Sequence, residues 1–147
     1  MARYLVVAHQ TATSRPLVEQ LRSLARDDSE ASFTLVVPST HVEHLLTWTE
    51  GEARAVANRV ADEASQVYRG YDLRVEGASV GDDSPLQAID DALHADADYT
   101  AIVISTLPAG ISRWLKLDVH SQARRRFSLP VISVIASEEE IDAARRR

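Results

Sequence analysis

Cysteine, long apolar runs and an excess of positive charge are all missing from this sequence of 147 residues. Without cysteine there is neither a disulfide nor a thiolate metal site, so we expect a reducing compartment. No apolar run approaches the roughly 18 residues of a membrane span, and residues 1–15 lack the pattern of a signal peptide. We therefore predict a soluble cytoplasmic protein with no membrane partner.

The charge balance is acidic, with 16 Lys and Arg against 22 Asp and Glu and a formal net charge of -6. Such a balance repels nucleic acid, so we expect no nucleic-acid partner. The run Arg124–Arg126 is a local exception. On a short helix such a run is typical of a solvated face that the helix C-terminus favours.

Short apolar runs alternate with helical patterns along the whole chain. Leu73 and Val75 alternate with polar neighbours, which is typical of an edge strand, whereas the run after Thr100 is continuously apolar, as in a strand covered on both faces. The length fits one domain, and we predict a single domain over residues 1–147. The predicted strands are Tyr4–Ala8, Phe33–Val37, Leu73–Ala78, Thr100–Ser105 and Val131–Ile135.

Capping signals mark the helices between these strands. Ser14 and Ser84 each precede a proline that suits the first helical turn. Thr49 opens a Thr-Glu-Gly-Glu capping box, after which apolar residues recur at steps of three and four until Gly70 ends the helix. At the end of the helix that Ser84 caps, Asp96 is expected to face water.

This alternation predicts an α/β fold with one doubly wound, open, parallel five-stranded sheet and helices on both faces. In such sheets, ligands bind outside the carboxyl ends of the strands, where the strand order reverses. The candidate site residues therefore come from the loops after the first, second and fourth strands: His9, Thr11, Ser39, Ser105, Thr106, Gly110, Arg113 and Asp118.

Several of these residues have a ligand-binding and a structural interpretation. Ser105 and Thr106 bring hydroxyls and amides to the switch point, and Arg113 brings a guanidinium fork that suits a carboxylate or phosphate. Arg113 alternatively pairs with an acidic side chain or packs along the surface. Trp114 offers a stacking platform or a packing residue, and Asp118 is most simply the N-cap of a helix that begins near residue 119.

The segment from Thr100 to Val134, with its strand, long connection, helix and final Leu-Pro-Val-Ile-Ser-Val strand, resembles the universal stress protein family. The resemblance covers essentially the whole chain and implies the strand order 3-2-1-4-5. The stretch STLPAGISRWLKLD is similar to a variant found in actinobacterial stress-protein-like domains of unknown role.

Nucleotide-binding members of this family carry G-x2-G-x9-G-[ST] after the fourth strand, where glycines let backbone amides wrap the phosphates. The corresponding residues here are Ile104, Leu107, Leu117 and Asp118, so aliphatic side chains replace the glycines and a carboxylate replaces the hydroxyl. The loop after the first strand also departs, since it begins with His9 where nucleotide binders show an Asp. The resemblance therefore implies the fold without the usual ATP loop, and we expect no cofactor, with ATP or AMP as the alternative.

Three hypotheses about function follow. The first is a non-catalytic stress-response or regulatory domain that acts through protein contacts as a homodimer, paired through the edge strand Pro130–Ile135. The second is a small-ligand sensor that holds a nucleotide or another anion at the switch point. The third is a hydrolase with Ser105, His9 and Asp118 as a triad, although the sequence lacks G-x-S-x-G. The five histidines show no zinc-ligand spacing, so we predict no metal site.

Overall fold

The computed structural model describes residues 1–39, 50–96, 98–107, 114 and 118–136. Strands and helices alternate along these residues, as the sequence predicts. The strands are β1 (Arg3–Val7), β2 (Ser32–Pro38), β3 (Arg74–Gly81), β4 (Ala101–Thr106) and β5 (Val131–Ile135). The helices are α1 (Arg15–Asp27), α2 (Glu50–Gly70), α3 (Pro85–Ala95) and α5 (Val119–Arg126). None of the helices in the described residues is long and apolar enough to cross a membrane.

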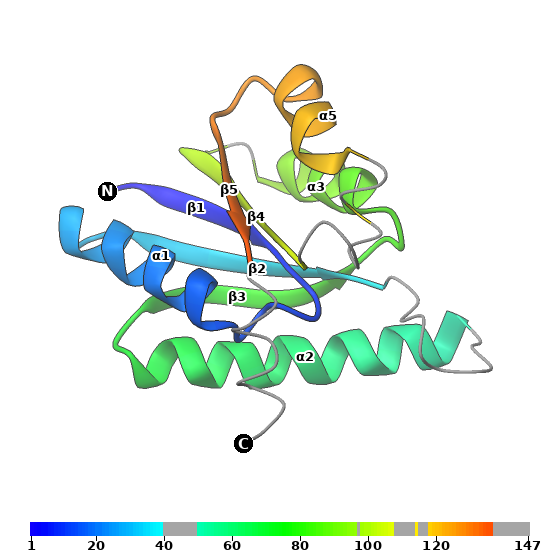
Figure 1. Cartoon of the computed structure of the whole chain (residues 1–147), viewed down its shortest axis with the longest axis horizontal. Coiled ribbons are helices and arrows are strands. Elements are labelled where there is room, and N and C mark those ends of the chain that lie inside the picture. Colours follow the sequence, from blue (N-terminus) through cyan, green and yellow to red (C-terminus); the bar gives the residue numbers. More distant parts are fainter. Residues whose placement is uncertain (40–49, 97, 108–113, 115–117, 137–147) are drawn as a thin grey trace.

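The five strands form one parallel sheet in the order β3-β2-β1-β4-β5 (Figure 1). The predicted fold class, the strand order and the edge position of β3 are therefore confirmed. The order reverses between β1 and β4, because the chain builds outward to β3 on one side of β1 and then crosses to the other side.

Each face of the sheet has its own apolar cluster. Helices α1 and α2 cover one face, where Leu17, Leu21 and Tyr68 pack on alternate residues of β1 and β2. Helices α3 and α5 cover the other face, where Ile89 and Ala123 pack on the intervening residues. This two-sided burial explains the continuous apolar runs Leu5–Val7 within β1 and Ala101–Ile104 within β4.

The predicted caps of α1 and α3 are confirmed. The Ser14 hydroxyl accepts a hydrogen bond from the Leu17 amide, and the Ser84 hydroxyl accepts one from the Gln87 amide, each at 3.4 Å. The capping box at Thr49 lies outside the described residues. The end of α2 at Gly70 agrees with the sequence pattern.

Strand β3 contains a register shift at Glu76. Phe33 of β2 lies opposite Val75, but the next residue of β2 lies opposite Gly77, so Glu76 has no partner in the ladder. The bulge moves the core-facing positions from odd to even numbers, and Ala78 and Val80 pack toward the same cluster as Val75. It also leaves the Glu76 side chain free to turn toward β1.

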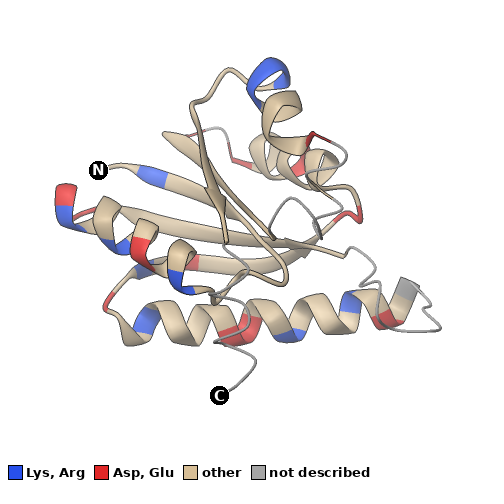
Figure 2. Cartoon of the chain, viewed as in Figure 1, with Lys and Arg blue, Asp and Glu red and all other residues tan. Residues whose placement is uncertain are grey.

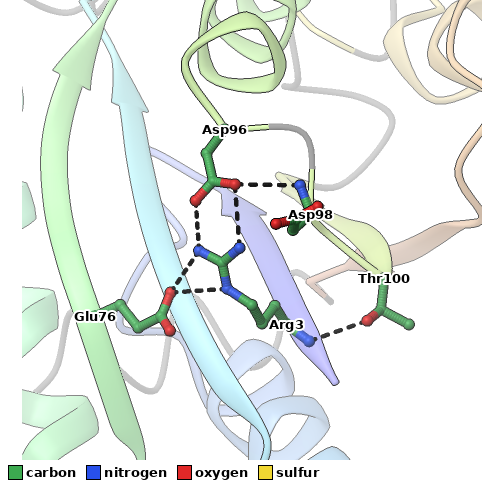
Figure 3. Close-up of polar contacts among 5 residues, drawn as sticks. All are labelled: Arg3, Glu76, Asp96, Asp98 and Thr100. Atoms are coloured by element: carbon green, nitrogen blue, oxygen red, sulfur yellow. Dashed lines mark hydrogen bonds and ion pairs between the residues drawn. The ribbon is translucent and has the colours of Figure 1, made fainter. Parts of the chain in front are cut away.

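At the amino end of the sheet, Arg3 binds two carboxylates at once (Figure 3). Its guanidinium donates to both oxygens of Asp96, at 3.2 and 2.7 Å, and to Glu76 at 3.2 and 2.9 Å. The same group lies 5.0 Å from the centre of the Tyr99 ring, and the Arg3 amide donates to the Thr100 hydroxyl. Arg3 thereby joins β1, β3 and the segment between α3 and β4. Asp96, expected to face water, is a member of this cluster.

Candidate functional site at the carboxyl end of the sheet

The carboxyl ends of β1, β2 and β4 bring most of the candidate residues to one edge of the sheet. These residues are buried and carry no fixed charge, in contrast to the ionic cluster at the opposite end. The buried members are His9, Thr11, Ser39, Ser105 and Thr106, together with His120 of α5. Gly110 and Arg113 lie outside the described residues.

Thr11 and Ser105 form a closed pair. Their hydroxyl oxygens lie 2.6 Å apart and share a hydrogen bond, and the Ser105 side chain is only 1% exposed. The loop that carries Thr11 is held from both sides, because the Ser14 amide donates to the Thr11 carbonyl and the Tyr68 hydroxyl donates to the Ala12 carbonyl at 2.6 Å. The first and fourth strands are thus joined by a buried polar contact at the point where the strand order reverses.

Thr106, the last residue of β4, shares a hydrogen bond with His120, with 3.2 Å between Oγ1 and Nε2. His120 is not among the site residues predicted from the sequence, where it is one of five histidines without zinc-ligand spacing. A signal was present, because His120 follows Val119 and precedes Ala123 by three residues, which places it on the buried face of α5. Burial lowers the pKa of His120, and nearby Arg124 lowers it further.

The His9 carbonyl accepts a hydrogen bond from the Ala12 amide, but the His9 imidazole has no hydrogen bond within the described part of the chain, whereas the His120 ring lacks a partner only at Nδ1. The His9 ring is 7% exposed, and neither Nδ1 nor Nε2 has a partner. Burial without compensation lowers the pKa of His9, so the neutral ring is favoured. A buried polar group left in this way costs stability, which makes it the unusual feature of this site.

Ser39 lies on the side of the site toward β3. Its amide donates to the carbonyls of Gly81 at 3.1 Å and Asp82 at 3.2 Å, so it closes the carboxyl end of the β2 and β3 pair. The structure places Ser39 near the same edge as Thr11 and Ser105, but on a separate hydrogen-bond system.

Asp118 has the N-cap position of α5, as predicted, but its side chain makes no capping hydrogen bond. The interpretation of its carboxylate as a cap is therefore wrong. Its backbone is left-handed, with φ 55°, whereas a residue that caps through its side chain is typically extended. Trp114 is buried at 7% exposure among Val119, Phe127 and the residues of α3, which confirms its packing interpretation.

The described contacts do not include those of the hydrolase triad that the sequence suggests. A hydrolase would need Ser105 to bond a base, yet its hydroxyl is bonded to Thr11, and in the described ranges no bond joins it to His9. Nor do the residues described here include a group of three His, Asp or Glu that could hold a metal ion. The described side chains of the site are neutral hydrogen-bond donors and acceptors that are almost fully buried.

A sheet order that reverses between β1 and β4, with polar groups beyond those strand ends, defines a doubly wound α/β protein. Among solved structures, the chain is similar to universal stress proteins. One is the protein from Archaeoglobus fulgidus in complex with dAMP, 18% identical with a TM-score of 0.59 over 91% of this chain and 97% of that chain.

A second is a family member from Burkholderia pseudomallei, 15% identical with a TM-score of 0.60 over 92% of this chain and 96% of that one. A third is a universal stress protein in complex with cAMP, 14% identical with a TM-score of 0.60 over 92% and 98%. The resemblance predicted from the sequence is confirmed at the level of the fold. No family model matches the sequence, and no curated protein matches it.

Proposed function

We propose that this chain is a non-catalytic regulatory domain of the universal stress type, without the usual ATP loop, which acts in the cytoplasm through protein contacts. The observation that carries the proposal is the closed pair of Thr11 and Ser105, buried at 2.6 Å. A hydroxyl that binds a ligand or attacks a substrate must be accessible to it, whereas these two hydroxyls are buried and bonded to each other. The second hydroxyl of β4, Thr106, is likewise bonded to His120.

The protein contact that we propose first is a homodimer formed through β5. This strand lies at the edge of the sheet, and Ile135 at its end is 52% exposed. An edge strand presents unpaired amides and carbonyls that a second copy can use, and a two-fold dimer uses the same surface twice.

A small-ligand sensor is the second candidate, and His9 is the observation that favours it. Both ring nitrogens are buried and without partners in the described residues, so a ligand with donor and acceptor groups would compensate them. Two universal stress proteins of similar fold were solved with dAMP and with cAMP. Both ligands are adenine nucleotides, so an adenine nucleotide is the first ligand to test here.

Thermal unfolding of the purified protein, alone and with millimolar ATP and Mg²⁺, AMP or inorganic phosphate, separates the two candidates. A ligand at about a hundred times its Kd adds about 2.7 kcal/mol, which for this size raises the midpoint by roughly 5–10 °C. We expect no shift with any of them. A shift of the midpoint that Arg113→Ala abolishes would instead establish an anion site in the loop after the fourth strand. A shift that His9→Phe abolishes would establish a ligand-sensing site at His9.

The homodimer is tested by size-exclusion chromatography with light scattering at micromolar concentration. We expect a molar mass of twice that of the chain. A monomer across the accessible concentrations would refute the dimer and leave partners of other sequence as the protein contact.

A further inference from the structure

The main-chain groups of β5 divide between those that pair with β4 and those on the outer edge of the strand, which pair with no other strand in the described residues. The Ile102 amide donates to the Pro130 carbonyl at 2.9 Å, and the Ala136 amide donates to the Thr106 carbonyl at 3.0 Å. Because successive residues of a strand direct their polar groups to opposite sides, the even-numbered residues pair with β4. The amides and carbonyls of Val131, Ser133 and Ile135 therefore point away from the sheet.

One charged side chain covers part of this open edge. Arg124, in the last turn of α5, donates from Nη2 to the Ser133 hydroxyl at 2.6 Å and reaches the Val131 carbonyl at 3.5 Å. The Val131 carbonyl is one of the outward groups, so Arg124 occupies a position that any added strand would need. Figure 2 shows the basic residues of α5 gathered at its C-terminal end, in a part of the molecule where β4 and β5 carry no charge.

The spacing of the outward groups is complementary to itself. In an antiparallel pair of two β5 strands centred on Ser133, that residue faces its own copy, and Val131 faces Ile135 of the second copy. Both kinds of pair are hydrogen-bonded pairs, because the amides and carbonyls of Val131, Ser133 and Ile135 all point toward the second copy. In this register the Val131 carbonyl would accept from the Ile135 amide of the second copy, and this is the carbonyl that Arg124 reaches at 3.5 Å.

We propose that Arg124 is a guard on this edge, which weakens the pairing of β5 with a second copy and makes it depend on salt. The proposal rests on the homodimer put forward above and adds a residue that controls it. Directly opposite residues of an antiparallel pair share one face, so the two Ser133 side chains would lie about 5.5 Å apart by their Cα atoms. Each would bring its Arg124 toward the two-fold axis, and two guanidinium groups at that range repel unless salt screens them.

Sedimentation velocity of the full chain across a concentration series, at about 0.05 M and about 0.5 M NaCl, tests the guard. The variants are Arg124→Ala, Arg124→Lys and the matched control Arg125→Ala, whose arginine is exposed and makes no ion pair or hydrogen bond in the described residues. We expect Arg124→Ala to lower the dimer Kd roughly tenfold and to remove its salt dependence. Arg125→Ala should change the Kd by less than about twofold, and Arg124→Lys should keep the salt dependence.

A second variant identifies the surface. Ile135→Pro deletes an outward amide and leaves the ladder with β4 complete, so it should abolish association in the Arg124→Ala background without changing the thermal midpoint of the monomer by more than a few degrees. Persistence of the dimer in Ile135→Pro would mean that association uses another surface and would overturn the guard.

The failure of the guard is distinguishable from the failure of the dimer. A wild-type dimer whose Kd responds equally to Arg124→Ala and Arg125→Ala refutes the guard and keeps the dimer. A wild-type monomer that dimerises only as Arg124→Ala refutes the dimer as the native state and keeps the guard. If every variant is monomeric at both salt concentrations, both proposals are wrong.

Discussion

The two ends of the sheet hold the fold together by different means. Every charged residue of the five strands, namely Arg3, Arg74 and Glu76, lies within the first three residues of its strand. At the carboxyl end the contacts are made by neutral groups that are almost fully buried, among them Thr11 and Ser105. The amino end therefore uses partly exposed ions, and the carboxyl end uses dry hydroxyls and imidazoles.

A lost contact should cost more stability at the carboxyl end than at the amino end. Water can replace a partner of Arg3, whose side chain is about a quarter exposed at 26%, so the ionic cluster is worth little per contact in spite of its charge. Water does not reach Ser105, so a hydroxyl left without a partner there loses a full hydrogen bond. The neutral end is the more sensitive of the two, and it is also the end where the candidate site lies.

The greatest loss of stability is expected from a substitution at the neutral carboxyl end. Ser105→Ala leaves the Thr11 hydroxyl buried without the partner it has at 2.6 Å, and we expect the free energy of unfolding to fall by about 2 kcal/mol. Urea denaturation followed by far-UV circular dichroism measures this loss. Adding Thr11→Val removes the orphaned hydroxyl and should restore part of the stability. A loss below about 0.5 kcal/mol in the single variant would show that another group replaces the partner.

Breaking the ionic end should cost less. Arg3→Ala removes the cation between Glu76 and Asp96, and we expect a loss of about 1 kcal/mol in the same assay, since the cluster is bidentate but partly solvated. The control is Arg22→Ala, which breaks an exposed pair with Glu19 three residues away and a contact with the Tyr71 ring at 4.9 Å, and which should cost about 0.5 kcal/mol. Equal losses for the two variants would mean that the cluster acts as an ordinary surface pair.

The same variant should change the response to acid. The hydrogen bonds from Arg3 lower the pKa of Glu76 and of Asp96, so the folded protein binds fewer protons at these groups than the unfolded chain does. Their contribution is present above the unfolded pKa of about 4 and is lost as the pH falls through the lower folded values. Arg3→Ala should flatten this acid dependence, and urea titrations between neutral and strongly acidic pH measure it.

The two ends of the sheet should also differ in the pH range over which their stability changes, because the carboxyl end contains His9 and the amino end contains carboxylates. Burial lowers the pKa of His9, so stability is full above the unfolded pKa of about 6.5 and falls below it, by at most about 1.4 kcal/mol per pH unit. His9→Phe should remove the share of this dependence that comes from His9 and leave the share of His120, whose pKa is also lowered. Near pH 7.5 it should raise the free energy of unfolding by about 1 kcal/mol, since both nitrogens of His9 lack partners. A destabilised variant would show that His9 has a partner in solution.

The smallest effect concerns Asp118. Its left-handed backbone, at φ 55°, and its missing cap bond predict that Asp118→Gly gains about 0.5 kcal/mol, because glycine adopts this conformation at little cost. The thermal midpoint should rise by a degree or two. A decrease would indicate that the carboxylate stabilises α5 through its charge at the helix N-terminus.

Much of the fold could be predicted from local pattern. Continuous apolar runs located four strands and an alternating pattern located β3, each to within three residues, and Ser14 and Ser84 marked the helix starts, because burial and capping act over a few neighbouring residues. The general rule for doubly wound sheets brought His9, Thr11 and Ser105 to one edge before any contact was known. The strand order itself came from the family resemblance.

The contacts inside the site could not be predicted in the same way. Thr11 and Ser105 are 94 positions apart, and their pairing depends on the register of β1 against β4 and on two side-chain rotamers. Arg3 and Asp96 are similarly distant, and Glu76 reaches them only because of the bulge in β3. No local pattern encodes such pairings, which explains why Asp96 was expected in water and His120 was overlooked.

That bulge also bears on how large an assembly can become. A sheet with two flat, open edges can add copies at both, and repeated addition gives filaments. Here Glu76 interrupts the regular ladder at the β3 edge, since one residue of β3 opposes none in β2. Of the two edges of the sheet in the described residues, β5 alone then has a regular ladder, so a copy that paired there would use up the surface available for growth. Assembly through strands should therefore stop at a closed pair.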